Sequence, residues 1–259
     1  MKPAPFDYVC PDSVAETVAL LARHGGDAKL LAGGQSLVPL LNFRMLRPGV
    51  LIDINRLTEL DFLSDDAGGL RVGALTRHRT LEASPLVRER FPVLSEAMAH
   101  VAHLAIRNRG TIGGSLAHAD PAAELPMLAL LLDAEIRTCS AAGARSHQAG
   151  DFFVGPLTTA LTEDEMISEI ILPALPPSTG WAFEEVAQRA GDFAIAAVAA
   201  TVTVSDGIVA GARLAAMGVG ETPLRLGEVE ARIAGKAFAP GLIQTAAQEA
   251  RAAVRPGTD

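Results

Sequence analysis

The sequence of 259 residues predicts an α+β protein, and three observations support that class. Segments with apolar residues at helical spacing alternate with short apolar runs bounded by glycine, which are typical of buried strands. A proline-rich stretch at residues 173–178 marks the strongest boundary candidate along the chain. Behind it, residues 197–204 and 208–217 have the pattern of two strands joined by a hairpin turn.

The N-terminal segment predicts a small α/β unit. A capping box at residues 13–16, followed by an apolar stripe, predicts a helix that ends near Gly25. A short strand is expected at residues 29–32, and a tight turn and a helical segment at 37–41 follow it. Residues 50–54 have the apolar pattern of a buried strand.

The middle of the chain alternates between strand and helix patterns. Residues 70–74 predict a strand, and Thr76 is a candidate N-cap for the helix after it. Residues 91–106 predict one long helix, because their apolar residues recur at helical spacing. Another helix is expected over residues 120–133, with Pro121 at its first position.

Two helical segments are expected to close the chain, around residues 224–233 and 242–254. The lengths on either side of the proline-rich stretch fit ordinary domain sizes. The predicted domains are residues 1–176, with subdomains of about 1–55 and 56–176, and a smaller domain over 177–259.

Charge and cysteine content exclude several classes of protein. With 22 basic and 30 acidic residues, the net charge of −8 argues against a nucleic-acid surface, which needs a basic face. Cys10 and Cys139 form neither a CxxC pair nor a metal-ligand spacing, so no disulfide framework or iron–sulfur cluster is expected on this chain. Neither a signal-peptide core nor an apolar run of membrane-spanning length is found, which predicts a cytoplasmic protein.

Two glycine turns share one design, Ala-Gly-Gly-Gln-Ser at residues 32–36 and Thr-Ile-Gly-Gly-Ser at residues 111–115. Without Cβ atoms, consecutive backbone N–H groups can converge on one anion, and the serine and threonine hydroxyls add donors. Neither turn contains Lys or Arg, so a bound pyrophosphate would be held by neutral donors and helix N-termini. Two ordinary tight turns explain the same pattern about equally well.

Other site motifs are incomplete. The chain has no GxGxxG fingerprint, and Gly218 to Gly220 is followed too soon by Pro223 for a Rossmann turn. Residues 34–38 lack one glycine of a nucleophile elbow, so a hydrolase acting through Ser36 remains a weak alternative. His100 and His103 have no third partner at metal-ligand spacing.

Three motifs, in order, resemble the flavin subunit of molybdenum hydroxylases. The first is residues 32–36 with the stretch 42–54, the second is residues 106–126, and the third is residues 189–194. They are similar to the medium subunit of carbon monoxide dehydrogenase and to the module fused within xanthine dehydrogenase. The resemblance runs from about residue 6 to residue 255.

This resemblance implies a fold and a set of partners. The fold is an FAD-binding fold of the PCMH, vanillyl-alcohol-oxidase-like type: two α/β subdomains, then a smaller C-terminal α/β domain with an antiparallel sheet. FAD would be bound noncovalently, beside a large subunit with the molybdenum cofactor and a small subunit with two 2Fe–2S clusters, as a dimer of heterotrimers. Electrons would pass through FAD to an external acceptor, and the chain would contribute no catalytic side chain or metal ligand.

The resemblance also assigns cofactor contacts by position. Residues 29–31 lie on the adenosine side, Glu124 matches an acidic residue that contacts a ribose or ribityl hydroxyl, and Ile167 and Phe193 match positions by the isoalloxazine ring. The complete set is Lys29, Leu30, Leu31, Ala32, Gly33, Gly34, Gln35, Ser36, Leu37, Thr111, Ile112, Gly113, Gly114, Ser115, His118, Glu124, Ile167, Asp192 and Phe193.

Some features differ from the family pattern or stay open. Glu184 and Glu185 stand where relatives often have a lysine, and relatives usually continue with a further helix after the position of Asp259. A self-sufficient flavin oxidoreductase and a flavin-free assembly protein are the alternative functions. The substrate and the acceptor, whether oxygen, NAD or a quinone, are not specified by these residues.

Overall fold

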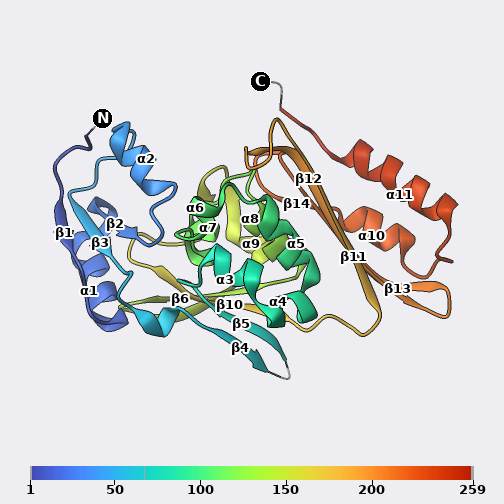
Figure 1. Ribbon diagram of the computed structural model, residues 1–259, viewed down its shortest axis with the longest axis horizontal. Coiled ribbons are helices and arrows are strands. Elements are labelled where there is room, and N and C mark those ends of the chain that lie inside the picture. Colours follow the sequence, from blue (N-terminus) through green and yellow to red (C-terminus); the bar gives the residue numbers. More distant parts are fainter. Residues whose placement is uncertain (1, 67, 258–259) are drawn as a thin grey trace.

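Three larger sheets follow one another along the chain in the computed structural model, which describes residues 2–66 and 68–257. They are arranged along the long axis of the molecule, with the N-terminal sheet at one end and most of the helices in the middle (Figure 1). A fourth sheet has only two strands. This mixture of helices and mainly antiparallel sheets confirms the predicted α+β class.

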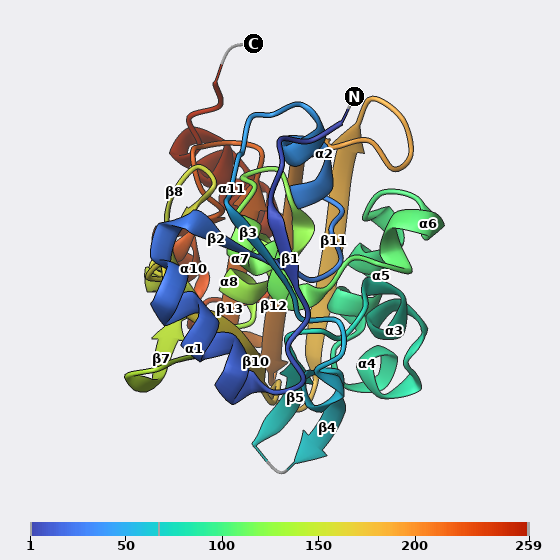
Figure 2. The same cartoon turned by 90° about the vertical axis from the view of Figure 1, so that its left-hand side faces the viewer.

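The N-terminal sheet has three parallel strands in the order β1-β3-β2 and faces the viewer in Figure 2. The predicted capping of the first helix is confirmed, because Ser13 Oγ accepts a hydrogen bond from the N–H of Glu16 at 3.1 Å. The elements are β1 (Asp7–Val9), α1 (Val14–His24), the 3₁₀ turn η1 (Gly25–Asp27), β2 (Ala28–Leu31), α2 (Leu37–Asn42) and β3 (Val50–Asp53).

The central sheet is antiparallel, in the order β4-β5-β10-β6-β7, and β10 pairs between strands that are distant from it in sequence. Its helices all come between β5 and β10. The elements are η2 (Thr58–Leu60), β4 (Leu63–Asp66), β5 (Gly69–Gly73), α3 (His78–Ala83), α4 (Pro85–Arg90), α5 (Pro92–His100), α6 (Leu104–Arg107), α7 (Ile112–His118), α8 (Glu124–Leu131), β6 (Glu135–Ser140), β7 (Gly143–Gln148), α9 (Ala149–Phe152), β8 (Phe153–Gly155), β9 (Thr158–Thr159) and β10 (Met166–Pro173).

The C-terminal sheet is an antiparallel meander in the order β11-β12-β13-β14. The predicted hairpin is confirmed: Asp206 and Gly207 have φ values of +50° and +76°, the pair of positive values that a type I′ turn requires. The elements are β11 (Thr179–Ala187), β12 (Ala194–Ser205), β13 (Ile208–Met217), β14 (Leu224–Arg225), α10 (Gly227–Ile233) and α11 (Pro240–Ala253).

All eight residues of α8 are buried, because the helix lies between the central helices and the C-terminal sheet. A helix that is apolar on every side is stable only when it is enclosed in this way. Phe183, Ala199 and Met217 of the C-terminal sheet belong to the same hydrophobic cluster as α5, α7 and α8. The N-terminal sheet has a separate cluster around Leu21 and Ile52. The apolar core therefore runs across the proline-rich stretch rather than ending there.

Two predicted helix starts are wrong. Thr76 does not cap α3, which begins at His78 after Arg77, because the Thr76 hydroxyl donates to the carbonyl of Phe62 at 2.9 Å. The helix expected from Pro121 begins only at Glu124. Here the Asp120 carboxylate accepts the N–H of Ala122 at 2.9 Å, which favours a turn over the first helical residues.

The helix predicted over residues 91–106 is also interrupted. It divides into α5 and α6 at Ala102, whose φ of +44° is outside the helical region. The guanidinium group of Arg107 donates to the carbonyls of Val101 and Ala102, at 2.9 and 2.8 Å, and to Glu82 at 2.9 Å. Apolar spacing could not reveal the break, because these bonds replace the missing helical ones. No helix in the described part of the chain is long and apolar enough to cross a membrane.

Arg107→Met is expected to lower the free energy of unfolding by about 3 kcal/mol, since it leaves two carbonyls unpaired in a mostly buried site and leaves Glu82 only the more exposed Arg79 as a partner. Urea denaturation measures this loss. Arg79→Met is the matched control: Arg79 pairs with the same Glu82 at 3.1 Å but is 49% exposed, so its loss should stay below about 1 kcal/mol. Equal losses in the two variants would contradict the assigned role of Arg107.

Candidate functional site

The first glycine turn lies against the residues that come directly before the second turn. The first connects β2 to α2, and the second begins α7. A Cβ atom on Gly33 would lie 2.3 Å from the carbonyl oxygen of Arg109, although real Cβ atoms essentially never approach within 3.0 Å. Gly33 is therefore required where the first turn meets the residues that lead into the second.

The first turn leaves a run of backbone N–H groups without an acceptor. No described residue accepts a hydrogen bond from the N–H of residues 33–37. Gly34 has a φ of +74°, which turns the chain sharply before α2, and Gln35 Nε2 donates back to the Gly33 carbonyl at 2.8 Å. Ser36 is exposed beside these groups. Free N–H groups in a turn before a helix form an anion-binding concavity.

The second turn uses most of its N–H groups inside the protein. Their acceptors are Thr76 O for Ile112 at 3.1 Å, Ala74 O for Gly113 at 2.9 Å and Thr111 Oγ1 for Gly114 at 3.1 Å. Gly113 serves packing, since a Cβ there would lie 2.7 Å from Ala74. The expectation of consecutive free N–H groups is therefore wrong for this turn, which can offer only the hydroxyls of Thr111 and Ser115 and the N–H of Thr111.

Asn55 and Arg77 connect the two turns by hydrogen bonds. Asn55 Nδ2 donates to the carbonyl of Ala32, the residue that opens the first turn, at 2.8 Å. Asn55 Oδ1 accepts from Arg77 Nη2 at 2.7 Å, and Arg77 Nη1 donates to the Arg109 carbonyl at 2.5 Å. The backbone of Arg77 also pairs with Thr111 in an isolated antiparallel bridge. A continuous chain of bonds thus runs from one turn to the other.

His78 supports the second turn from the protein interior. It is 7% exposed, and its Nε2 lies 3.0 Å from the carbonyl of Thr111. Burial lowers the pKa of His78 to about 4, so the ring is neutral near pH 7 and Nε2–H is the donor to that carbonyl. A Cβ on Gly110 would lie 2.8 Å from the ring, so this glycine is needed for the contact.

Glu124 is the buried carboxyl group of the predicted site. It begins α8 and is 8% exposed. Burial raises its pKa to about 7, and the charges of Glu185 and Asp120 act in the same direction. Burial also raises the pKa of Glu185, whose Oε1 lies 3.9 Å from His100 Nδ1. The junction of α5, α8 and β11 therefore holds two carboxyl groups that keep their protons more readily than exposed ones.

The other predicted residues lie in different surroundings. Residues 29–31 belong to β2 and are partly buried, and His118 ends α7 in a similar state. Phe193 is 73% exposed beside Asp192, between β11 and β12. Ile167 is 6% exposed and packs in the main core, so it presents no open face.

Two other polar side chains, those of Arg107 and Asp53, are bound to partners within the protein. Arg107 is bound to Glu82 and to three backbone carbonyls, so it does not face a ligand. Asp53 accepts the Tyr8 hydroxyl and the N–H of Asn55, which makes it a turn residue. In the described ranges no group of three His, Cys, Asp or Glu could hold a metal ion.

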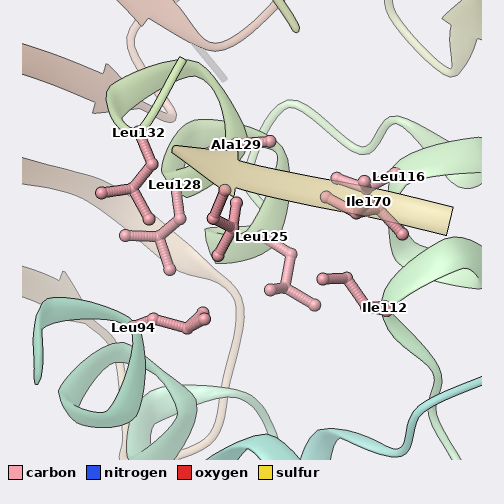
Figure 3. Close-up of a pocket in the computed structure, with 9 residues that line it drawn as sticks. Leu94, Ile112, Leu116, Leu125, Leu128, Ala129, Leu132 and Ile170 are labelled. Atoms are coloured by element: carbon pink, nitrogen blue, oxygen red, sulfur yellow. The ribbon is translucent and has the colours of Figure 1, made fainter. Parts of the chain in front are cut away.

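The cavities of the structure lie away from the free N–H groups. One void of about 10 Å³ is lined by side chains of α5, α7, α8 and β10. Figure 3 labels Leu94, Leu125 and Ile170 among these lining residues. A void of this size and apolar lining stays dry. A second hollow, of about 190 Å³, lies by the C-terminal sheet near Pro176 and Arg213. The first glycine turn therefore lines neither hollow, whereas Ile112 of the second turn contributes its side chain to the small void.

Sequence reasoning missed three residues of the site, Asn55, Arg77 and His78. Their partners are 22 to 33 positions away in sequence, so no local spacing marks them. Arg77 falls beside the position where a helix cap was expected. Only the folded chain shows that these side chains meet the glycine turns.

Two family models cover almost the whole chain. One is described as the FAD binding domain in molybdopterin dehydrogenase and matches residues 4–175. The other is described as the CO dehydrogenase flavoprotein C-terminal domain and matches residues 181–259.

Individual relatives agree with these models. The chain is 48% identical to the 6-hydroxypseudooxynicotine dehydrogenase complex subunit alpha of Paenarthrobacter nicotinovorans, over 89% of this chain and 78% of the relative. It is 43% identical to the caffeine dehydrogenase subunit beta of a Pseudomonas species, over 91% of this chain and 80% of the relative. It superposes with a TM-score of 0.97 on a structure of carbon monoxide dehydrogenase from Hydrogenophaga pseudoflava, at 42% identity, covering 100% of this chain and 90% of the other.

Gly33→Ala should lower the free energy of unfolding by about 1 to 3 kcal/mol, because the new Cβ would push the Arg109 carbonyl away. Urea denaturation of the protein without ligand measures it. Gly150→Ala, in α9, has nothing within 4 Å of the new Cβ and serves as the control. If both variants were equally stable, the close approach of the turns would be wrong.

Glu124 should make the protein less stable as the pH rises from about 4.5 to 7, because the folded chain keeps a proton that the unfolded chain has lost. Glu124→Gln removes this dependence. The stability of the variant relative to the unsubstituted protein should therefore increase by about 2 to 3 kcal/mol between pH 5 and pH 8. Urea unfolding at both pH values tests this, with the exposed Glu228→Gln as the control that should show no such change.

Proposed function

We propose a function from one premise: the chain belongs to the family of FAD-binding medium subunits of molybdenum hydroxylases. It is accordingly a subunit of an oxidoreductase and a flavoprotein. The proposal goes further: the chain receives electrons from iron–sulfur clusters of a partner and passes them through FAD to an external acceptor. The observation that carries it is the first glycine turn, with its run of N–H groups that have no acceptor among the described residues.

The residues at the turns fit the pyrophosphate of FAD. An anion of this kind needs converging donors, and residues 33–37 supply N–H groups that the fold leaves unused. The hydroxyls of Ser36, Thr111 and Ser115 can add donors. The net charge of −8 does not oppose binding, because oriented amide dipoles set the local field.

The proposed cofactor contacts are those expected from the sequence, except for Ile167 and the N–H groups of residues 112–114. Glu124, as a buried carboxyl group with a raised pKa, can donate to or accept from a ribose or ribityl hydroxyl. Phe193 and Asp192 would flank the isoalloxazine ring from an exposed loop. Ile167 is packed behind α7 in the core, so we assign it to the support of that helix.

The work of this chain is to bind, orient and shield. FAD, when bound, supplies the redox chemistry, because it accepts electrons singly and releases them in pairs. The glycine turns would fix the cofactor by its pyrophosphate, and the buried junction at Glu124 would limit the access of water. The exposed Phe193 is suited to control which acceptor reaches the ring. No side chain is needed as nucleophile or general base.

The partners follow from the same role. A large subunit would hold the molybdenum cofactor and a small subunit two 2Fe–2S clusters, in a dimer of heterotrimers. Two relatives are described as a complex subunit and a medium chain, which supports a multi-subunit assembly.

Within this chain, we propose domains at residues 1–176 and 177–259, with a subdomain boundary near residue 55, since each larger sheet falls within one of these parts.

Purified protein, assembled with its partner subunits, should be yellow and should release FAD on denaturation. Gly33→Val should abolish FAD binding, because the side chain would separate the turns. Flavin absorbance per mole of protein measures both. Gly211→Val is the control, because this strand position has nothing within 4 Å of a new Cβ. Full FAD content in the Gly33→Val protein would contradict the site.

Metal content separates this proposal from a self-sufficient flavin oxidoreductase. Molybdenum and iron should co-purify with the flavin-containing complex in a fixed ratio. Flavin without either metal, together with turnover of a substrate by this chain alone, would favour the self-sufficient enzyme. A protein that binds no FAD even beside its partners would favour an assembly protein.

A further inference from the structure

We propose that Asn55 and Arg77 are positioning residues that hold the two glycine turns at the separation an FAD pyrophosphate requires. This inference rests on the proposed FAD-binding function. Neither residue belongs to the set of cofactor contacts, and both act through backbone carbonyls of the turns or of the residues next to them.

The turns need such a connection because they belong to different parts of the fold. The first turn extends from β2 of the N-terminal sheet, whose core cluster forms around Leu21 and Ile52. The second begins α7, which packs in the larger cluster with α5 and α8. The cluster around Leu21 and Ile52 also includes Leu75 and Met166 of the following part, so apolar packing holds the two parts together. At the turns themselves, we assign the fine adjustment of their separation to hydrogen bonds across the junction.

Arg77 is bound on both sides of this junction. Its Nη1 reaches the carbonyl of Arg109, the same oxygen against which Gly33 packs. Its Nη2 reaches Asn55, whose amide holds the Ala32 carbonyl. The two oxygens that accept from the guanidinium group lie 2.5 and 2.7 Å from its nitrogens, short distances that are typical of charge-assisted bonds. One side chain therefore fixes the entry to both turns.

Arg77 also differs from its neighbours in its charge partners. Arg71, Arg79 and Arg107 each pair with a carboxylate, at 2.5, 3.1 and 2.9 Å. Among the described residues no carboxylate pairs with Arg77 in this way, and its bonds go to neutral oxygens. The carboxylates of Asp61 and Asp53 act on Arg77 only through space, so its N–H groups remain available to hold the oxygens that lead to the two turns.

The test compares FAD affinity with the stability of the FAD-free protein, using the full chain in its complex. Arg77→Met should raise the dissociation constant of FAD by roughly 10- to 100-fold, which corresponds to the loss of charge-assisted bonds. Arg79→Met, two residues along in α3 and free of both turns, should change it by less than about 3-fold. Flavin fluorescence quenching gives both constants.

Rescue and coupling separate positioning from a general loss of structure. Arg77→Lys should recover part of the affinity, since an ammonium group can reach one of the two oxygens. Millimolar methylguanidinium should recover part of it in Arg77→Ala. The double variant of Asn55→Ala and Arg77→Met should lose no more affinity than the worse single variant, because the two residues form one chain of bonds.

Three results would overturn the inference while FAD still binds to the unsubstituted protein. The first is an unchanged affinity for FAD in Arg77→Met, and the second is additive losses of affinity in the double variant. The third is a loss of affinity that equals the loss of stability of the FAD-free protein and that neither Arg77→Lys nor methylguanidinium reduces. If the unsubstituted complex bound no FAD, the proposed function would fall, and this inference with it.

Discussion

The contact between Gly33 and the carbonyl of Arg109 determines how the N-terminal sheet meets the rest of the molecule. A side chain at residue 33 would overlap that oxygen, so the glycine is required by the junction as well as by any ligand. Once the backbones touch here, Asn55 and Arg77 can bridge them with short hydrogen bonds. The N–H groups of residues 33–37, which have no acceptor among the described residues, belong to the turn that makes this contact.

The second constraint is the burial of α8. Because every residue of this helix is enclosed, the C-terminal sheet must stay packed on it through side chains such as Phe183 and Met217. Glu124 stands at the first position of the helix, so its carboxyl group enters the same buried junction. Its raised pKa is a consequence of this placement. The burial of α8 thus accounts both for the raised pKa of Glu124 and for the packing of the C-terminal sheet.

The proposed site would attract an anion without a cluster of basic side chains. The N–H groups of the first turn would supply neutral donors, and the neutral His78 ring holds the Thr111 carbonyl without adding charge. Arg77 adds one positive charge at the junction of the turns, but its hydrogen bonds go to carbonyl and amide oxygens. A protein with a net charge of −8 can therefore present a local site for a doubly charged group.

By itself, the sequence determined the elements with strong local signals: the capped helix after Ser13, the hairpin at Asp206 and Gly207, and both glycine turns. These features depend on neighbours within a few residues, so spacing and composition reveal them. The tertiary structure alone decided three other features. The helix breaks at Ala102 because Arg107 binds the carbonyl there, and α8 begins late because Asp120 binds the N–H of Ala122. The N–H groups of the second turn are used inside the protein because the carbonyls of Ala74 and Thr76 accept from them. The tertiary structure also decided the Asn55–Arg77 connection. Contacts between residues 22 to 32 positions apart exist only after the sheets have packed, and no local pattern encodes them.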